Sequence, residues 1–197
     1  TVKSAMATLR QQARELEEAA DRLGQSPLGF QEAVRLSTEV LDKGGSLILT
    51  GMGKSGLVAR KTAATLQSIG MSALPLHPAD AIHGDLGMIR SGDVVMAISY
   101  SGETQEILRL LPSLTRRGCP IIAVTGQAGS SLARASRAIL DVSVGSEAHP
   151  TIPAPTTSTT LAMAMGDALA LALADARQVN DQDFALHHPG GALGRRL

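Results

Sequence analysis

The sequence predicts a doubly wound α/β fold, with a five-stranded parallel sheet flanked by helices and a helical arm at the amino terminus. Short apolar runs of strand length alternate with helix-like segments between residues 46 and 177. Strands separated by helices in this way form right-handed crossovers and pair in parallel. Two of the runs end in turns rich in glycine and hydroxyl residues, at 51–56 and 99–104. Since ligands bind at the carboxyl ends of parallel strands, we expect both turns at one site.

The helical arm occupies residues 1–45. Gly24 ends a long first helix, and Ser26-Pro27 begins a second one that stops at Gly44-Gly45. Both helices precede the first strand, so they either cover the sheet or pack against another subunit. Apolar residues in the first helix recur at steps of three or four with charged residues between them, which predicts an amphipathic helix. The apolar positions are Val2, Met6, Leu9, Ala13, Leu16, Ala20 and Leu23, and the charged ones are Arg10, Arg14, Glu15, Glu17 and Glu18.

Apolar runs supply the five strands, at 47–49, 73–76, 94–98, 121–124 and 139–144. The third run, Val-Val-Met-Ala-Ile, follows Ser-Gly-Asp and is too short for a lone helix, so it suits a strand buried on both faces. Helices are expected after the first strand, as far as Ile69, and at 131–137. Pro112 is expected to break the helix that follows the third strand into two pieces that meet there.

Residues 156–176 predict a long apolar helix. Asp167 is its only charge before Asp175, so the helix is expected to be buried nearly all round. Its length would suit a membrane span, but Asp167, Gly166 and the hydroxyl residues at its start favour a protein interior or a subunit interface. The end of the tail that follows, residues 181–197, is too specific in composition for a disordered linker.

The composition limits the classes of function. The 197 residues are 44% hydrophobic and 2% aromatic, which suits one domain with an aliphatic core and leaves almost no platforms for stacking nucleobases. Eighteen basic residues balance eighteen acidic ones, so we expect no binding to nucleic acid or to anionic membranes. The single cysteine, Cys119, forms no internal disulfide, and no secretory signal is evident. A soluble cytoplasmic protein with a small anionic ligand is the expectation.

The turn at 51–56 matches the pattern G-x-G-x-x-G of dinucleotide-binding proteins. That fingerprint also needs an acidic residue at the end of the next strand, where the sequence reads Leu76-His77-Pro78 and Asp80 comes slightly late. Dinucleotide binding is therefore a minor alternative. A nucleotide-binding P-loop is excluded by spacing, because position 48 is Ile rather than Gly.

Hydroxyl and lysine side chains of the two turns indicate a phosphate site. Lys54 and Ser55 lie on the first turn, and the second adds Ser99, Ser101 and Thr104, with Gly102 allowing close approach to the backbone. A helix start behind such a turn favours an anion.

Four separated motifs, at 51–56, 83–88, 99–104 and 188–191, resemble the sugar isomerase (SIS) domain of the D-arabinose 5-phosphate isomerases. The resemblance covers almost the whole chain and implies one SIS-type, flavodoxin-like domain over 1–197. Its parts are the arm 1–45, the core 46–177 and a tail, 178–197, that completes the site. Two regulatory CBS modules usually follow the segment that resembles Arg195-Arg196, so an isolated catalytic domain is expected. Tyr100 replaces a common Asn and His149 a usual Cys, which puts substrate preference in doubt.

The resemblance implies that Lys54, Glu106, Glu147 and His188 are catalytic. Isomerisation through an enediol needs a base, a cation or acid near the developing oxyanion, and a grip on the phosphate. His188 is expected to open the cyclic sugar, one glutamate to act as the base and Lys54 to stabilise the oxyanion or phosphate. A carboxylate suits the base if its surroundings raise its pKa. Glu103 is a further candidate for the base, but a structural role as a complement to the dipole of the following helix explains it at least as well.

Further expectations complete the site and its setting. Ser55, Ser99, Ser101 and Thr104 would bind phosphate, with Gly53 and His83 as additional substrate contacts. Enediol chemistry needs no cofactor or metal, and the resemblance implies that a zinc ion on His83 would be inhibitory or adventitious. The resemblance implies a homotetramer that acts on D-ribulose 5-phosphate and D-arabinose 5-phosphate in Kdo and lipopolysaccharide biosynthesis. The alternative is a SIS module that senses sugar phosphates without catalysis.

Overall fold

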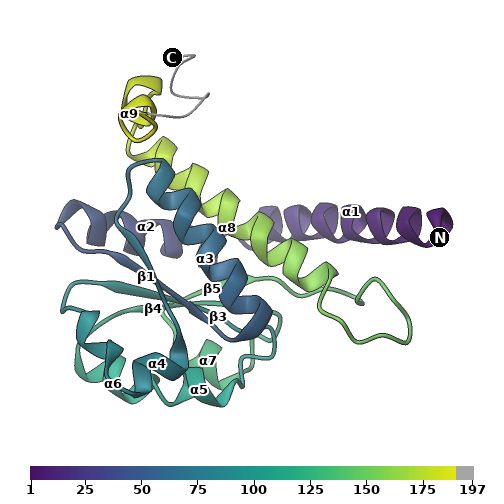
Figure 1. Ribbon diagram of the computed structural model, residues 1–197, viewed down its shortest axis with the longest axis horizontal. Coiled ribbons are helices and arrows are strands. Elements are labelled where there is room, and N and C mark those ends of the chain that lie inside the picture. The colour runs from purple at the N-terminus through teal and green to yellow at the C-terminus, as the bar shows by residue number, and fades with distance from the viewer. Residues whose placement is uncertain (190–197) are drawn as a thin grey trace.

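A computed structural model describes residues 1–189 of the chain and contains the predicted sheet (Figure 1). All four strand pairings are parallel, and the strands lie in the order β2-β1-β3-β4-β5. The doubly wound α/β prediction is therefore confirmed. The strands are β1 (Leu47–Gly51), β2 (Ala73–Leu76), β3 (Val94–Ile98), β4 (Ile121–Thr125) and β5 (Ala138–Asp141).

The strand order places a topological switch point between β1 and β3. The two strands pair in register from Leu47 opposite Val94 to Gly51 opposite Ile98. From β1 the chain first passes outward to β2 and then crosses back to β3, so the loops after β1 and β3 leave a crevice between them. Open α/β sheets bind ligands at this kind of crevice.

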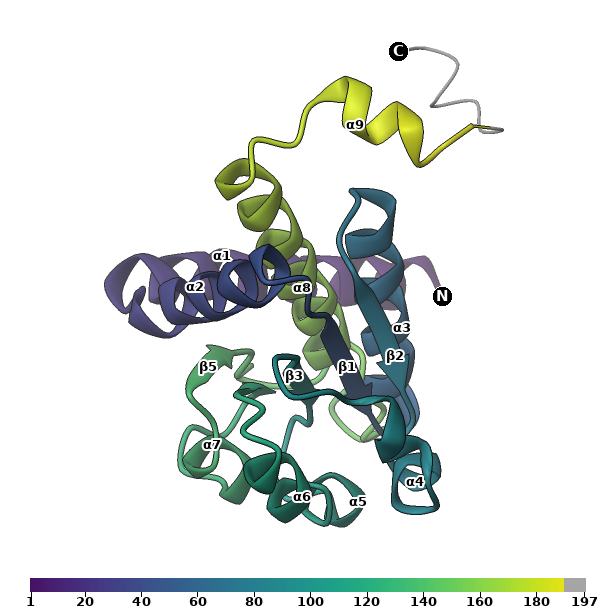
Figure 2. The ribbon, with the colours of Figure 1, turned by 90° about the vertical axis from the view of Figure 1, so that its left-hand side faces the viewer.

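Helices cover both faces of the sheet (Figure 2). One face carries α1 (Val2–Gln25), α2 (Leu28–Asp42), α3 (Gly53–Ser68) and α8 (Thr157–Ala176). The other carries α4 (Pro78–Ile82), the 3-10 turn η1 (Asp85–Met88), α5 (Gln105–Leu108), α6 (Leu111–Arg116) and α7 (Ser131–Arg134). A last helix, α9 (Asp181–Leu186), follows α8.

Each strand contributes alternate side chains to two separate cores. In β1, Leu47 and Leu49 pack under α3 and α8, whereas Ile48 packs toward α4–α6. All three are fully buried. Burial on both faces explains why β1, β3 and β4 read as continuous apolar runs instead of alternating ones, whereas the edge strands β2 and β5 are partly exposed.

Some element boundaries differ from the predicted ones. The helix after β3 is in two pieces, as predicted, but the break lies at Arg109-Leu110 and Pro112 sits in the first turn of α6. Proline is tolerated there because a first-turn N–H has no partner within the helix. The strand expected at 139–144 ends at Asp141. The short elements α4, η1 and α9 had no clear periodic signal.

Helix α1 is amphipathic, but its buried face differs from the predicted one. Glu15 and Ala19 are its buried residues, whereas Ala13 and Ala20 are exposed. The amino-terminal half extends beyond the rest of the fold, where Val2, Met6 and Leu9 are exposed (Figure 1). The face toward the protein is set by the polar partners that it meets and not by hydrophobicity alone.

Helix α8 is long and apolar enough to cross a membrane by length and composition, but half of its most apolar window is buried within the protein. It packs against α1, α2 and α3. Met163 and Leu171 remain exposed, so the helix is less completely covered than its composition predicts. The interior position accounts for most of its apolar character.

Candidate functional site

A cavity of about 380 Å³ lies at the carboxyl edge of the sheet, at the switch point. It brings together the first turn of α3, the loop after β3, and the loop between β5 and α8. Three predicted site residues line it, Lys54, Ser55 and Glu147, together with Tyr100. These residues come from distant parts of the sequence, and the parallel sheet is what gathers them.

Close packing of strand β1 against helix α3 positions Lys54 and Ser55. A Cβ atom on Gly51 would lie 2.7 Å from the carbonyl carbon of Ser55, and one on Gly56 would lie 2.6 Å from the carbonyl oxygen of Gly51. Only glycine allows this approach. The helix begins at Gly53, so the predicted glycine turn is mostly first helical turn. The Lys54 side chain is exposed and forms no ion pair among residues 1–189.

Glu147 is held against the amino terminus of α8. One of its carboxylate oxygens accepts hydrogen bonds from the backbone N–H groups of Thr156 (2.7 Å), Thr157 (2.8 Å) and Ser158 (3.4 Å). The hydroxyls of Thr156 and Ser158 donate as well. Unpaired N–H groups at a helix start and the helix dipole both favour an anion at this place.

These contacts decide the protonation state of Glu147. Burial raises its pKa, but the hydrogen bonds from Ser158 and Thr156 outweigh burial, so the pKa lies below its ordinary value. The carboxylate is therefore ionised at neutral pH. The direction is opposite to the raised pKa expected of a catalytic base, and Glu147 must give up part of its hydrogen bonding to accept a proton.

The hydroxyl-rich turn borders the cavity through Ile98 and Tyr100. Within it, Ser99 is buried and its Oγ lies 2.8 Å from Thr104 Oγ1, while the Gly102 N–H donates to Ser99 Oγ at 3.1 Å. Ser101 is exposed, and its Oγ accepts from the Glu103 N–H at 3.2 Å. Three of the four predicted phosphate ligands thus share one compact turn, and none of these three lines the cavity wall, whereas the fourth, Ser55, does.

Glu103 has a structural partner outside the cavity. Its carboxylate accepts a hydrogen bond of 2.7 Å from the Ser131 backbone N–H, at the start of α7. Hydrogen bonds from Ser131 hold the pKa of Glu103 below its ordinary value. The residue complements a helix start, as one of the two expectations had it, but the helix is α7 and not the one that directly follows.

Tyr100 links the two loops around the cavity. Its ring packs on Gly126, where a Cβ atom would lie 2.6 Å from the ring. Its hydroxyl lies 3.4 Å from the carbonyl oxygen and 3.3 Å from the amide nitrogen of Val144, three residues before Glu147. A smaller residue at position 100 would not reach Val144 and would leave the space between the two loops unfilled.

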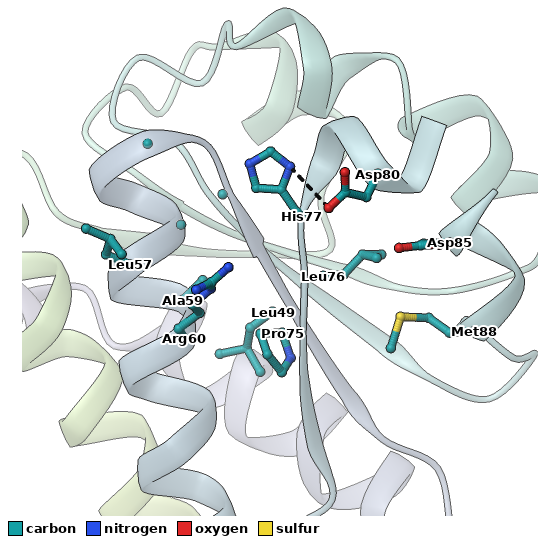
Figure 3. Close-up of a pocket in the computed structure, with 13 residues that line it drawn as sticks. Leu49, Leu57, Ala59, Arg60, Pro75, Leu76, His77, Asp80, Asp85 and Met88 are labelled. Atoms are coloured by element: carbon teal, nitrogen blue, oxygen red, sulfur yellow. Dashed lines mark ion pairs between the residues drawn. The ribbon is translucent and has the colours of Figure 1, made fainter. Parts of the chain in front are cut away.

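A second cavity, of about 650 Å³, lies beyond α3 at the ends of β1 and β2 (Figure 3). Gly53 lines it, together with Arg60, His77, Asp80 and Asp85. His77 and Asp80 face each other there at 3.8 Å. Although this cavity is larger, it contains none of the four predicted catalytic residues, so the smaller one is the candidate site.

Two further predicted residues lie outside the candidate cavity. Glu106 is half-buried in the first turn of α5, directly after the hydroxyl-rich turn. His83 is exposed at the end of α4. Among residues 1–189, no group of three His, Cys, Asp or Glu side chains is arranged to hold a metal ion.

His188 comes just after α9, which lies beyond the carboxyl end of α8, whereas Glu147 is bound at the amino end of α8 (Figure 1). The ring of His188 stacks on Phe184 of α9, with centroids 3.9 Å apart, and its Nδ1 lies 2.8 Å from the Phe184 carbonyl oxygen. The neighbouring His187 contacts Gly70, just beyond the carboxyl end of α3, whereas Lys54 is at the amino end. A helix of 16 residues spans roughly 24 Å. One chain therefore does not bring His188 to Lys54. The glycines of the motif at 188–191 and Arg195-Arg196 lie outside the described residues.

The site also contains residues that sequence reasoning did not assign. Thr156 and Ser158 hold Glu147, and their position at the start of a helix after proline was the available signal. Tyr100 was noted only as a departure from the family pattern. Glu15 contacts the Glu147 loop from α1, and nothing local in the sequence distinguishes it from the exposed glutamates beside it.

A protein-family model described as the SIS domain matches residues 40–172. The arabinose 5-phosphate isomerase KdsD of Pseudomonas aeruginosa is 50% identical over 153 residues, which are 78% of this chain and 47% of that protein. The arabinose 5-phosphate isomerase KpsF of Escherichia coli is 46% identical over 196 residues, 100% of this chain and 58% of that protein. The chain spans about half the length of these curated relatives.

Solved structures share the fold over nearly the whole chain. The protein c3406 of Escherichia coli CFT073, in complex with A5P, superposes with a TM-score of 0.83 at 37% identity. The match covers 96% of this chain and 100% of that one. A putative sugar-phosphate isomerase from Listeria monocytogenes superposes with a TM-score of 0.88 at 29% identity, over 96% of each chain.

Proposed function

Because this chain belongs to the SIS domain family, we propose that it is the catalytic domain of an aldose–ketose isomerase, interconverting D-ribulose 5-phosphate and D-arabinose 5-phosphate. The observation that carries the proposal is the cavity at the switch point, where Lys54, Ser55 and Glu147 meet beside the turn at 99–104. Relatives named as arabinose 5-phosphate isomerases favour an enzyme over a sensing module.

The residues of the cavity and of the adjoining turn at 99–104 supply the functions that enediol chemistry needs. A carboxylate takes the proton from C2 of the aldose, the resulting enediol is reprotonated at C1, and the ketose forms. Protons leave C2 and O2 and are added at O1 and C1, and the proton held by the carboxylic acid exchanges with solvent on the way. Atoms and electrons therefore balance without an oxidant, and the proposal includes no cofactor. The Lys54 ammonium stabilises the negative charge that develops on the carbonyl oxygen of the sugar. Ser55, Ser99, Ser101 and Thr104 hold the phosphate by hydroxyl and backbone N–H donors.

Two carboxylates compete for the role of base. Glu147 lines the cavity but is bound to the start of α8, whereas Glu106 lies in the first turn of α5, directly after the turn at 99–104. Glu147→Gln and Glu106→Gln separate them, because loss of the base lowers kcat and leaves exchange of the substrate proton with solvent undetectable. By contrast, loss of a residue that only orients the sugar lowers the rate of turnover and the rate of proton exchange with solvent by the same factor.

We further propose that the protein is a homotetramer in which His188 enters the cavity of a neighbouring subunit, where it opens the cyclic sugar. His187 lies against Gly70 at the carboxyl end of α3, and Lys54 is at the amino end, which supports contribution of His188 from another chain. The exposed apolar side chains on α1 and α8 are surface that such an assembly would cover. A cytoplasmic role in Kdo and lipopolysaccharide biosynthesis, with no nucleic-acid or membrane partner, is part of the same proposal.

Turnover of D-ribulose 5-phosphate tests the proposed function. The protein is incubated with this sugar, and the appearance of D-arabinose 5-phosphate is followed by NMR. Lys54→Ala is expected to lower kcat by at least about 100-fold, because a preorganised charge near a developing oxyanion contributes that order of rate. Lys43→Ala, an exposed lysine at the end of α2, is the matched control. Binding of the sugar without turnover in the wild type would favour the sensing module.

A further inference from the structure

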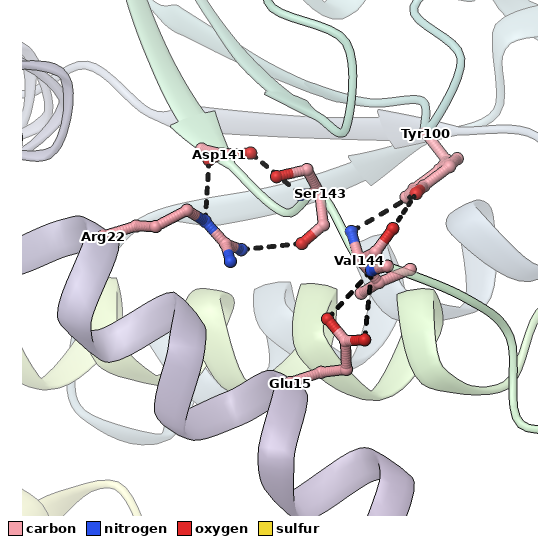
Figure 4. A network of polar contacts seen from close by, with 7 residues as sticks. Glu15, Arg22, Tyr100, Asp141, Ser143 and Val144 are labelled. Carbon is pink, nitrogen blue, oxygen red and sulfur yellow. Dashed lines mark hydrogen bonds and ion pairs between the residues drawn. The ribbon is translucent and has the colours of Figure 1, made fainter.

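Glu147 lies in a long loop whose position needs an explanation. Residues 142–156 connect β5 to α8 without a helix or strand of their own. Irregular connections of this length in compact domains are usually functional and need anchoring contacts. The N–H groups at the start of α8 anchor Glu147 on one side. What anchors the loop on the β5 side is helix α1 (Figure 4).

Three polar side chains on one face of α1 contact the loop. Arg22 donates to the Ser143 carbonyl oxygen at 2.7 Å and pairs with Asp141. Glu15 accepts from the Gly145 N–H at 3.0 Å to each of its carboxylate oxygens. Gln11, one turn earlier, donates to Ser146 Oγ at 3.2 Å. Spacings of four and seven residues place all three on the same side of the helix.

Glu15 is the unusual member of this group. It is 4% exposed, and within residues 1–189 it forms no ion pair with a cation. Its other partner is the Gln11 side-chain amide, at 3.0 Å. Burying a carboxylate is costly unless hydrogen-bond donors surround it, and an apolar side chain would fill the space more cheaply. The hydrogen bond from the Gly145 N–H explains why a glutamate occupies the buried position 15.

Gly145 is adapted to this contact. A Cβ atom at position 145 would lie 3.1 Å from Glu15 Oε1, closer than a side chain comfortably allows. On the other side, the Tyr100 hydroxyl meets the backbone of Val144. Two consecutive peptide units are therefore held from opposite directions, by α1 and by the loop that follows β3 (Figure 4).

We propose that Glu15 is a positioning residue of the isomerase: by holding the Gly145 N–H, it fixes Glu147, two residues later, at the cavity that contains Lys54. The inference rests on the proposed function and deepens it. Helix α1 lies outside the part of the chain that matches the SIS family model, residues 40–172, yet it is then part of the catalytic unit.

The effect is expected in kcat and not in KM. Glu15 contacts neither the turn at 99–104 nor Lys54, so binding of the phosphate is unaffected when Glu15 is replaced. Displacing a reacting group by about 1 Å costs on the order of 100-fold in rate. Glu15→Leu removes the acceptor while keeping an apolar side chain of similar size on the helix. Glu15→Gln keeps one acceptor oxygen for Gly145.

Steady-state kinetics and hydrogen exchange of the full chain test this inference. Glu15→Leu is expected to lower kcat by about 10- to 100-fold with KM within about twofold. Glu15→Gln restores kcat to within about threefold of the wild type, because one charge-assisted hydrogen bond becomes a neutral one. Glu18→Leu, at an exposed position on the same helix, leaves both constants unchanged. The Gly145 amide, read by NMR, exchanges at least about tenfold faster in Glu15→Leu than in the wild type.

Three outcomes are distinct. An inactive wild type with a protected Gly145 amide contradicts the proposed function and leaves the contact itself intact. An active wild type with Glu15→Leu at wild-type kcat overturns the positioning role while the isomerase remains. If Glu15→Leu fails to fold, Glu15→Gln decides: a kcat lowered within the predicted threefold, with KM unchanged and a Gly145 amide that exchanges faster than in the wild type, supports positioning, whereas wild-type kcat with the same faster exchange contradicts it. A Glu15→Gln rate lowered together with the unfolding midpoint, with Gly145 still protected, contradicts it.

Discussion

Glu147 and Glu103 both accept hydrogen bonds at the start of a helix, yet only Glu147 faces the cavity. The hydrogen bonds lower the pKa in both cases. The anionic form of Glu147 thus stabilises α8 and also places a negative charge near Lys54. A single side chain links the stability of the fold to the chemistry of the site.

Glu147→Gln is expected to destabilise the protein by about 1 kcal/mol at pH 7, the usual worth of an anionic helix cap. The pKa of Glu147 in the folded state is lowered, so its contribution to the free energy of unfolding is present above the ordinary value of 4.5 and is lost as the pH falls through the folded value. Urea unfolding at pH 7 and at about pH 3 measures the difference between wild type and variant. A difference that grows in acid would contradict the assignment.

Residues that carry a local signal could be predicted from the sequence. Lys54, Ser55 and Ser99 stand on turns after apolar runs, and the parallel sheet brings such turns together. Glu15 could not be predicted, because an amphipathic pattern places every charged residue of a helix on the exposed side. Its burial depends on a contact across 130 residues, with a backbone N–H that only the folded chain brings near.

At the scale of elements, the approach of α3 to β1 fixes the start of the site. Gly56→Ala is expected to destabilise the protein by about 1–3 kcal/mol, because the new methyl group would meet the Gly51 carbonyl oxygen at 2.6 Å and push α3 outward. Lys54 and Ser55 move with the helix, so kcat falls as well. Urea unfolding at fixed protein concentration and the NMR assay measure both effects.

Gly24→Ala is the matched control for this change. Gly24 lies near the end of α1, and a Cβ atom there has nothing within 4 Å. The same substitution should therefore stabilise the protein by up to about 1 kcal/mol, since alanine is the better helix former. Equal effects at both positions would show that close packing at Gly56 is not the cause.

Elements with a clear hydrophobic pattern could be predicted from the sequence, whereas element ends that depend on contacts with other parts of the fold could not. The apolar runs located all five strands, since the three central ones are buried along their whole length and contain few polar residues. Strand β5 ends at Asp141, which pairs with Arg22 of α1, a contact that no local pattern in the sequence predicts. The break between α5 and α6 lies before Pro112, because a proline can sit in a first turn as easily as end a helix.

At the scale of the whole molecule, the separation of His188 from Lys54 predicts shared sites. Lys54→Ala and His188→Ala subunits are each expected to be nearly inactive. When they are unfolded, mixed in equal amounts and refolded together, about a quarter of the sites combine an intact Lys54 with an intact His188 from a neighbour. Recovery of about a quarter of wild-type activity is the expected result. Mixed oligomers without activity would remove His188 from the neighbouring site.

Solvent exchange tests the central claim, that the cavity moves a proton through an enediol. D-arabinose 5-phosphate is incubated with the protein in D₂O, and the ketose is analysed by proton NMR. The account predicts D-ribulose 5-phosphate that carries deuterium at C1, formed by the wild type and the Lys43→Ala control and at least about 100-fold more slowly by Lys54→Ala. Ketose that retains its original hydrogen throughout, or sugar that binds and never isomerises, would contradict it.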